Sequence, residues 1–301
     1  MSTAPKRIAI VGSGSIGCLL GLHLTRRLAP AAVRTIPSSK PAPTINSDPK
    51  SINSKTKPAI TFLTRSPSPS TVTIHVSEPH ADRTASYSAH TALNTAGSGA
   101  FDAVVVTTKA QDTLAAVRPL VDSGAVTSST ALALVQNGYG QHMELADTVL
   151  RLAGIKMDHL VIGSATHGCY RNADDSRSQE GSWAVVHHAG VGTWTFGPWT
   201  CTGAPRPLPE TGNVPWLLSE LGALRTATAV PEPEIQGVLL RKLAVNAVIN
   251  PLTAVHRVRN GDLVDRPSLA AEVAALTREI AAIFHAHFPS HCWPRSRACA
   301  T

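Results

Sequence analysis

Apolar runs and polar or glycine-rich stretches alternate along the first two thirds of the chain. Short apolar runs bounded by turn residues are typical of strands that are buried on both faces of a sheet. We therefore expect a strand that begins near Ile8, further strands at residues 59–63, 72–76, 101–108, 130–135, 160–168 and 183–188, and a hairpin-rich continuation through 192–197.

The last third of the chain has a different periodicity. Pro, Gly and Thr are frequent between residues 198 and 215, and helical patterns follow at 216–224, 233–250 and 267–288. We expect the domain boundary in that stretch, with one domain at 1–200 and a second at 213–301. The predicted fold class is α/β: an N-terminal Rossmann-like, doubly wound domain followed by a mostly helical C-terminal domain.

Two segments of the first domain have weak patterns. Residues 30–58 are dominated by Pro, Ser, Lys, Thr and Asn, which predicts a flexible surface insertion. Residues 77–100 are rich in Ser and Ala, and they predict no definite element.

Composition excludes several classes of protein. The net charge is +7, but the basic residues are scattered and aromatics make up 4%, so we expect no nucleic-acid partner. We expect no apolar run long enough to span a membrane and no signal peptide before the first strand, which favours a cytoplasmic protein without a membrane partner. Five widely spaced cysteines without a C-x-x-C motif predict reduced thiols and no metal site.

The first predicted strand ends in a G-x-G-x-x-G turn, residues 12–17, which opens an apolar helix. In this context the first glycine permits the tight turn, the second lets a pyrophosphate approach the backbone, and the third lets helix and strand pack closely. We expect this turn to bind a dinucleotide through Gly12, Ser13, Gly14, Ser15, Ile16 and Gly17.

The second predicted strand is followed by Thr64-Arg65-Ser66, where NAD-binding folds usually carry an acidic residue. A guanidinium can bind a 2′-phosphate in a bidentate manner. Arg65 therefore favours NADP(H) over NAD, although it could also be an ordinary surface arginine.

Polar residues follow two more predicted strands. Lys109 and Gln111 come after the strand at 101–108, and Asn137 comes after the strand at 130–135. Open α/β sheets bind ligands at the carboxyl ends of their strands, so these residues are candidates for the site. Ordinary turn chemistry is the alternative for each of them.

The helical pattern at 233–250 carries Lys242, Asn246 and Asn250 at intervals of four, which places them on one helix face. We expect Leu239, Leu243, Val245 and Ile249 to pack inward, and Pro251 to end or kink the helix. One cation and two carboxamides would suit a small polar substrate. A solvated helix face explains the spacing equally well.

Taken in order, these motifs and the run K-x-x-x-N-x-x-x-N-P-L-T-A at 242–254 resemble the ketopantoate reductase (2-dehydropantoate 2-reductase) family over most of residues 7–284. The resemblance implies an oxidoreductase that acts on CH-OH and reduces a 2-oxo acid, 2-dehydropantoate, to (R)-pantoate with NADPH in pantothenate biosynthesis. It makes Lys242 the general acid.

The resemblance also implies roles for the other candidates. Asn246, Asn250 and Asn137 would bind substrate, while Arg65, Lys109, Gln111 and Asn137 would contact the cofactor. A later serine and glutamate of the family have no counterpart here, which makes the second domain look incomplete. A reductase of another 2-oxo or 3-oxo acid and a catalytically weak NADPH-binding protein remain open, as does a homodimer.

Overall fold

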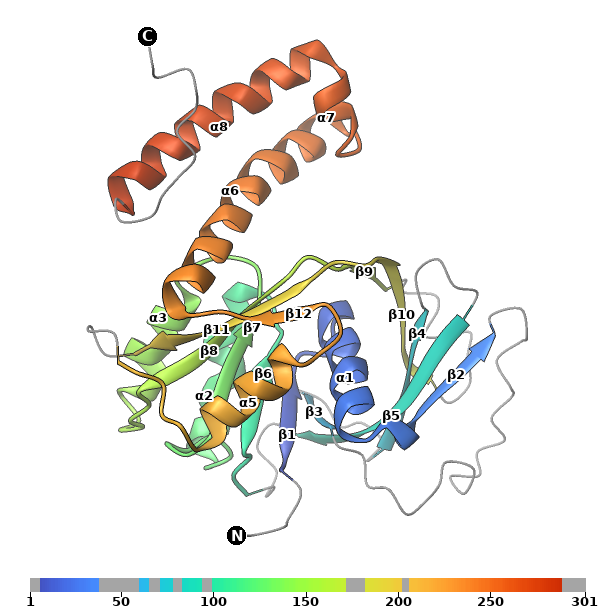
Figure 1. Cartoon of the computed structure of the whole chain (residues 1–301), viewed down its shortest axis with the longest axis vertical. Coiled ribbons are helices and arrows are strands. Elements are labelled where there is room, and N and C mark those ends of the chain that lie inside the picture. Colours follow the sequence, from blue (N-terminus) through green and yellow to red (C-terminus); the bar gives the residue numbers. More distant parts are fainter. Residues whose placement is uncertain are drawn as a thin grey trace. The chain divides into compact units, whose positions relative to one another are not determined.

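The structure is a computed structural model that describes residues 6–37, 60–64, 71–77, 83–93, 99–171, 182–201 and 206–288 (Figure 1). The chain forms two compact units. Unit 1 comprises Met1–Gln136 and Gly140–Ile235, and unit 2 comprises Asn137–Tyr139 and Gln236–Thr301.

Unit 1 is built on one mixed sheet, which has twelve strands in the described residues, in the order β12-β11-β8-β7-β6-β1-β3-β5-β4-β10-β9 with β2 paired to β5. The strands are β1 (Ile8–Val11), β2 (Val33–Pro37), β3 (Ile60–Thr64), β4 (Thr71–Ser77), β5 (Arg83–Leu93), β6 (Ala103–Val106), β7 (Ala131–Val135), β8 (His159–Ala165), β9 (Gly168–Tyr170), β10 (Ser182–Gly190), β11 (Trp194–Thr200) and β12 (Ala227–Ala229).

The centre of the sheet is parallel. β1 pairs in parallel with both β3 and β6, β6 with β7, and β7 with β8. Every residue of β1, β6 and β7 is buried, as expected for strands covered on both faces. The carboxyl ends of these neighbouring strands lie at one edge of the sheet, so the loops after them are brought together.

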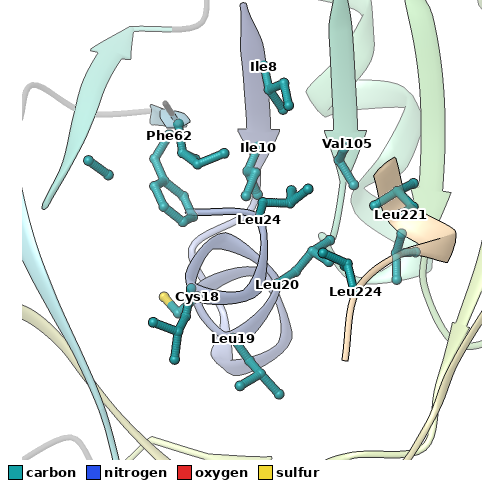
Figure 2. Close-up of a cluster of buried hydrophobic side chains, with 14 of the residues drawn as sticks. Ile8, Ile10, Cys18, Leu19, Leu20, Leu24, Phe62, Val105, Leu221 and Leu224 are labelled. Atoms are coloured by element: carbon teal, nitrogen blue, oxygen red, sulfur yellow. The ribbon is translucent and has the colours of Figure 1, made fainter. Parts of the chain in front are cut away.

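The helices of unit 1 are α1 (Ser15–Leu28), α2 (Thr113–Asp122), α3 (Gln141–Leu145) and α5 (Asn213–Gly222), with short turns η1 (Pro30–Ala32), η3 (Ala110–Asp112) and η4 (Ala146–Leu150). Figure 2 shows Leu19, Leu20 and Leu24 of α1 in the same buried cluster as Ile8 and Ile10 of β1. This packing holds α1 against β1.

The division between the units differs from the one expected at residues 198–215. α5 buries Leu217, Leu218 and Leu221 in the core of unit 1, and β12 pairs with β11. Unit 1 therefore continues to Ile235, because the helix after the Pro-rich stretch uses its apolar face to cover the sheet.

The sequence pattern does not indicate β2 and β5 as strands. Val33–Pro37 forms β2, antiparallel to β5, so the expected insertion is wrong over these residues, while 38–58 lies outside the described residues. The Ser- and Ala-rich stretch forms β5, in which Ala85, Tyr87 and Ala89 are buried. Partner strands on both sides override the low strand preference of its small residues.

Unit 2 contains most of α6 (Glu232–His256), together with α7 (Asp262–Asp265) and α8 (Pro267–His287). Its small core consists of Val248, Leu252, Leu263 and Leu269, with Val273, Leu276 and Ile280 packed against it. The α/β class, with a Rossmann-like first part and a helical second part, is confirmed.

α6 does not end at Pro251, and one side chain expected to pack inward is exposed. The helix continues through Pro251 to His256, and Thr253 Oγ1 donates a hydrogen bond to the Ile249 carbonyl at 2.8 Å. Packing of Leu252 into the unit 2 core favours this continuation over an end at the proline. Val245 was expected to pack inward, but it is 53% exposed.

Candidate functional site

The glycine turn is closed on one side by tight packing. Gly12 has φ +110°, and a Cβ there would lie 2.9 Å from the backbone and hydroxyl of Thr107. A Cβ on Gly17 would overlap the Gly12 carbonyl oxygen and lie 2.5 Å from Thr107 Oγ1. Thr107 Oγ1 donates a hydrogen bond to the Gly12 carbonyl at 2.8 Å. These two glycines are therefore required by the turn itself.

The other side of the turn is open. Gly14 is exposed, and a Cβ added to it would meet no atom within 4 Å. α1 begins at Ser15, and its first internal hydrogen bond is from Cys18 N–H to the Gly14 carbonyl at 3.0 Å. The N–H groups before Cys18 have no partner within the helix, and its first turn carries no acidic residue.

This arrangement fits a phosphate group. The start of a helix is an anion-binding site because its N–H groups and dipole favour negative charge. Space above Gly14, between two glycines that the fold itself requires, is what a pyrophosphate needs for close approach to the backbone. Ser13, Ser15 and Ile16 complete the loop around that space.

Arg171, which the sequence interpretation overlooked, contacts the glycine turn. Its Nη1 donates a hydrogen bond to the Ser13 carbonyl at 2.6 Å. Arg171 follows β9, more than 150 residues along the chain, so no local motif could have revealed the contact.

Lys109 and Gln111 follow β6, and both are exposed. β6 is the neighbour of β1, the strand that the glycine turn follows. Gln136, at the end of β7, holds the loop that carries them. Its Nε2 donates to the Thr108 carbonyl at 2.9 Å, and its Oε1 accepts from Thr113 Oγ1 at 3.1 Å. Gln136 thus positions the loop after β6, a role that its place beside Asn137 in the sequence did not suggest.

Asn137 follows directly on Gln136, but its contacts place it in unit 2. It is exposed, and it precedes Gly138, which has φ +105°. In the same unit, the rings of Tyr139 and Phe288 are 5.5 Å apart. The left-handed backbone at Gly138 explains the glycine, while the substrate role of Asn137 stays a prediction.

In unit 2, α6 carries Lys242, Asn246 and Asn250 at intervals of four, which places them on one helix face. Lys242 and Asn246 are half-buried, whereas Asn250 is exposed. Burial lowers the pKa of the Lys242 ammonium below its ordinary value. A desolvated lysine of this kind gives up its proton more readily than a surface lysine does.

Other candidate chemistry finds less support. Arg65 lies outside the described residues. Within the described ranges, no three His, Cys, Asp or Glu side chains are grouped so that they could hold a metal ion. Burial raises the pKa of Cys18 and Cys201 to about 12 and that of Cys169 to about 11, so these thiols stay protonated and are poor nucleophiles.

His167 and His188 are buried in unit 1, and His23 beside them is half-buried. His167 Nδ1 lies 3.0 Å from His188 Nε2, and His23 Nδ1 accepts a hydrogen bond from Trp194 Nε1 at 3.2 Å. Burial is the main cause that lowers the pKa of His23 to about 3 and that of His167 to about 4. Near neutral pH the rings of His23 and His167 are therefore uncharged.

One finding modifies the expectation about membranes. Among the described helices, α6 is long and apolar enough to cross a membrane, judged by length and composition alone. Core helices of soluble proteins meet the same criterion, so this is weak evidence for a membrane span.

Comparison with known proteins gives two family matches. Residues 8–200 match the family described as ketopantoate reductase PanE/ApbA, and residues 234–296 match that family's C-terminal region. A 2-dehydropantoate 2-reductase of Vibrio cholerae is 28% identical over 185 residues, which cover 62% of this chain and 53% of the relative. The chain spans about half the length of the curated relatives that it matches.

Solved structures share the fold. A dimeric ketopantoate reductase from Staphylococcus aureus aligns with a TM-score of 0.58 at 18% identity, covering 92% of this chain and 80% of the other. D-mandelate dehydrogenase, solved with NADH and anilino(oxo)acetate, aligns with a TM-score of 0.59 at 15% identity, covering 93% and 74%.

Proposed function

The chain belongs to the ketopantoate reductase family, and from that premise we propose that it reduces 2-dehydropantoate to (R)-pantoate with NADPH. The observation that carries the proposal is the row formed by Lys242, Asn246 and Asn250 on α6, with the lysine half-buried and its pKa lowered. A cation can stabilise the ketone oxygen of an oxo acid, and the two carboxamides beside it can hydrogen-bond the substrate.

The proposed roles follow from the chemistry of ketone reduction. Bound NADPH supplies the hydride, which gives the ketone carbon two electrons and leaves negative charge on its oxygen. Lys242 stabilises that charge and donates the proton that turns the oxygen into a hydroxyl. Its lowered pKa brings the acid closer to the working pH, where general acids are most effective. Asn246 and Asn250 hydrogen-bond the substrate and fix its orientation.

For the cofactor we propose NADP(H), held by residues of unit 1. The glycine turn takes the pyrophosphate in the space above Gly14. Arg65 binds the 2′-phosphate. It follows the predicted strand at 59–63, at the position where NAD-binding folds usually carry an acidic residue. Lys109 and Gln111 border the cofactor from the loop that Gln136 holds.

The decisive experiment is an assay of purified protein with NADPH and a panel of 2-oxo and 3-oxo acids, followed by the loss of NADPH absorbance. The proposal predicts the highest kcat/KM for 2-dehydropantoate. Turnover of a different acid alone would assign the chain to a related reductase. Tight NADPH binding without turnover of any acid would identify a cofactor-binding protein with little activity.

The oligomeric state is a separate proposal. The Staphylococcus aureus structure is described as dimeric, and we propose a homodimer for this chain as well. Light scattering on the eluting protein distinguishes a monomer from a dimer.

A further inference from the structure

We propose that Arg171 is a second phosphate-binding residue of the dinucleotide site, one that binds the pyrophosphate from the side of β9. The inference rests on the proposed cofactor and adds a residue that lies outside the glycine motif. It concerns binding and assigns Arg171 no part in the chemical step.

The fold brings Arg171 to the glycine turn. β9 pairs antiparallel with β10, and β10 pairs with β4 at the far side of the sheet. In Figure 1, β9 lies beside the end of α1 where the glycine turn enters the helix. Arg171 directly follows Tyr170, the last residue of β9, and Nη1 reaches the Ser13 carbonyl at 2.6 Å.

The contact places positive charge beside the glycine turn, at a carbonyl that also accepts a hydrogen bond from Cys18 Sγ at 3.4 Å. Ser13 directly precedes Gly14, beside which a Cβ would meet open space, and Gly14 precedes the first N–H groups of α1, which have no partner within the helix. The charge of Arg171 also reaches the first turn of the helix, because it opposes the burial that raises the pKa of Cys18. A phosphate at the helix start would thus lie close to both the N–H groups and the guanidinium.

The chemistry of arginine suits this position. A guanidinium carries five N–H donors in a planar fork, and the bond to the Ser13 carbonyl is made by Nη1. Arginine and phosphate commonly form two parallel charge-assisted bonds, which are stronger than a bond to a neutral carbonyl. The bond to Ser13 therefore holds an exposed side chain near the turn, and this side chain would form stronger bonds when a phosphate is present.

The test compares Arg171→Gln and Arg171→Lys with the unchanged protein, and uses Arg151→Gln as the matched control. Arg151 is also an exposed arginine of unit 1, and the variant removes the same charge away from the turn. NADPH and NADH are titrated by calorimetry at low and at moderate salt. Circular dichroism checks that each variant is folded.

Because the pyrophosphate is common to both cofactors, Arg171→Gln should weaken NADPH and NADH alike, by about 10–100-fold at low salt. The loss should shrink as salt screens the charge. Arg171→Lys should recover part of the affinity, and Arg151→Gln should bind both cofactors normally.

Unchanged affinity in Arg171→Gln, a loss limited to NADPH, or an equal loss in Arg151→Gln would overturn the proposal. A loss limited to NADPH would mean that Arg171 binds the 2′-phosphate. If the unchanged protein bound neither cofactor, the proposed function would fail together with this inference. Normal binding by the unchanged protein and by Arg171→Gln would refute the role of Arg171 alone.

Discussion

Alanine at two positions of the glycine turn should separate the stability of the turn from its binding of cofactor. Gly14 has φ −67° and ψ 177°, a conformation that alanine adopts freely, and its Cβ would meet no atom within 4 Å. Gly17 is buried, and its Cβ would overlap the Gly12 carbonyl and approach Thr107 Oγ1 to 2.5 Å. The same added methyl group thus meets opposite environments three residues apart.

The magnitudes follow from those environments. In Gly17→Ala, overpacking costs about 1–3 kcal/mol, and the better helix propensity of alanine returns at most about 1 kcal/mol. Because a backbone carbonyl cannot rotate away, we expect a net loss of about 1–2 kcal/mol of folding free energy, or a fall in Tm of several degrees. In Gly14→Ala the stability should change by no more than about 0.5 kcal/mol.

Urea unfolding of the free proteins, followed by titration with NADPH, measures both effects. Gly14→Ala should be as stable as the unchanged protein, yet bind NADPH at least about 10-fold more weakly, because the methyl group occupies the pyrophosphate space. Gly17→Ala should be less stable before any cofactor is added. Normal NADPH affinity in a folded Gly14→Ala variant would refute the assignment of the turn as the pyrophosphate site.

Two other predictions concern the cofactor and pH. Arg65→Ala should weaken NADPH by about 1.5–3 kcal/mol and leave NADH nearly unchanged, measured by calorimetry; equal losses would show that Arg65 does not bind the 2′-phosphate. Burial lowers the pKa of His142 and His167 from 6.5 to about 4, so the unfolded chain takes up more protons as the pH falls below 6.5. The free energy of unfolding should therefore be retained above about pH 6.5 and fall towards pH 4, by on the order of 1 kcal/mol for each histidine. Urea titrations at several pH values measure this change. A free energy of unfolding that does not change with pH would contradict the neutral, buried state of these rings.

The elements predicted best are those with strong local patterns. β1, β6 and β7 were recognisable because strands buried on both faces require continuous apolar runs. The turn after β1 was recognisable because it has no room for side chains at Gly12 and Gly17 and therefore requires glycine there. The helix with Lys242 was likewise recognisable from its spacing.

The features that were missed depend on distant partners. β5 is a strand because β2, β3 and β4 pair with it, although its own small residues favour no element. α5 belongs to unit 1 because of the apolar face it packs there. Arg171 reaches the glycine turn through the pairing of β9 with β10. The end of the helix at Pro251, one of the two outcomes expected there, is wrong because packing of Leu252 supports a longer helix.

Turnover of 2-dehydropantoate by Lys242→Ala tests most directly whether Lys242 protonates the substrate. Lys156→Ala, which removes an exposed lysine of unit 1, is the matched control, and NADPH titration checks that the cofactor still binds. One lost oxyanion contact costs about 10²–10³ in rate and one lost acid about 10²–10⁴, but a single group supplies both. We therefore predict that kcat falls by about 10²–10⁴ in Lys242→Ala while its NADPH affinity and the activity of Lys156→Ala stay normal. Equal turnover by Lys242→Ala and the unchanged protein would contradict the account.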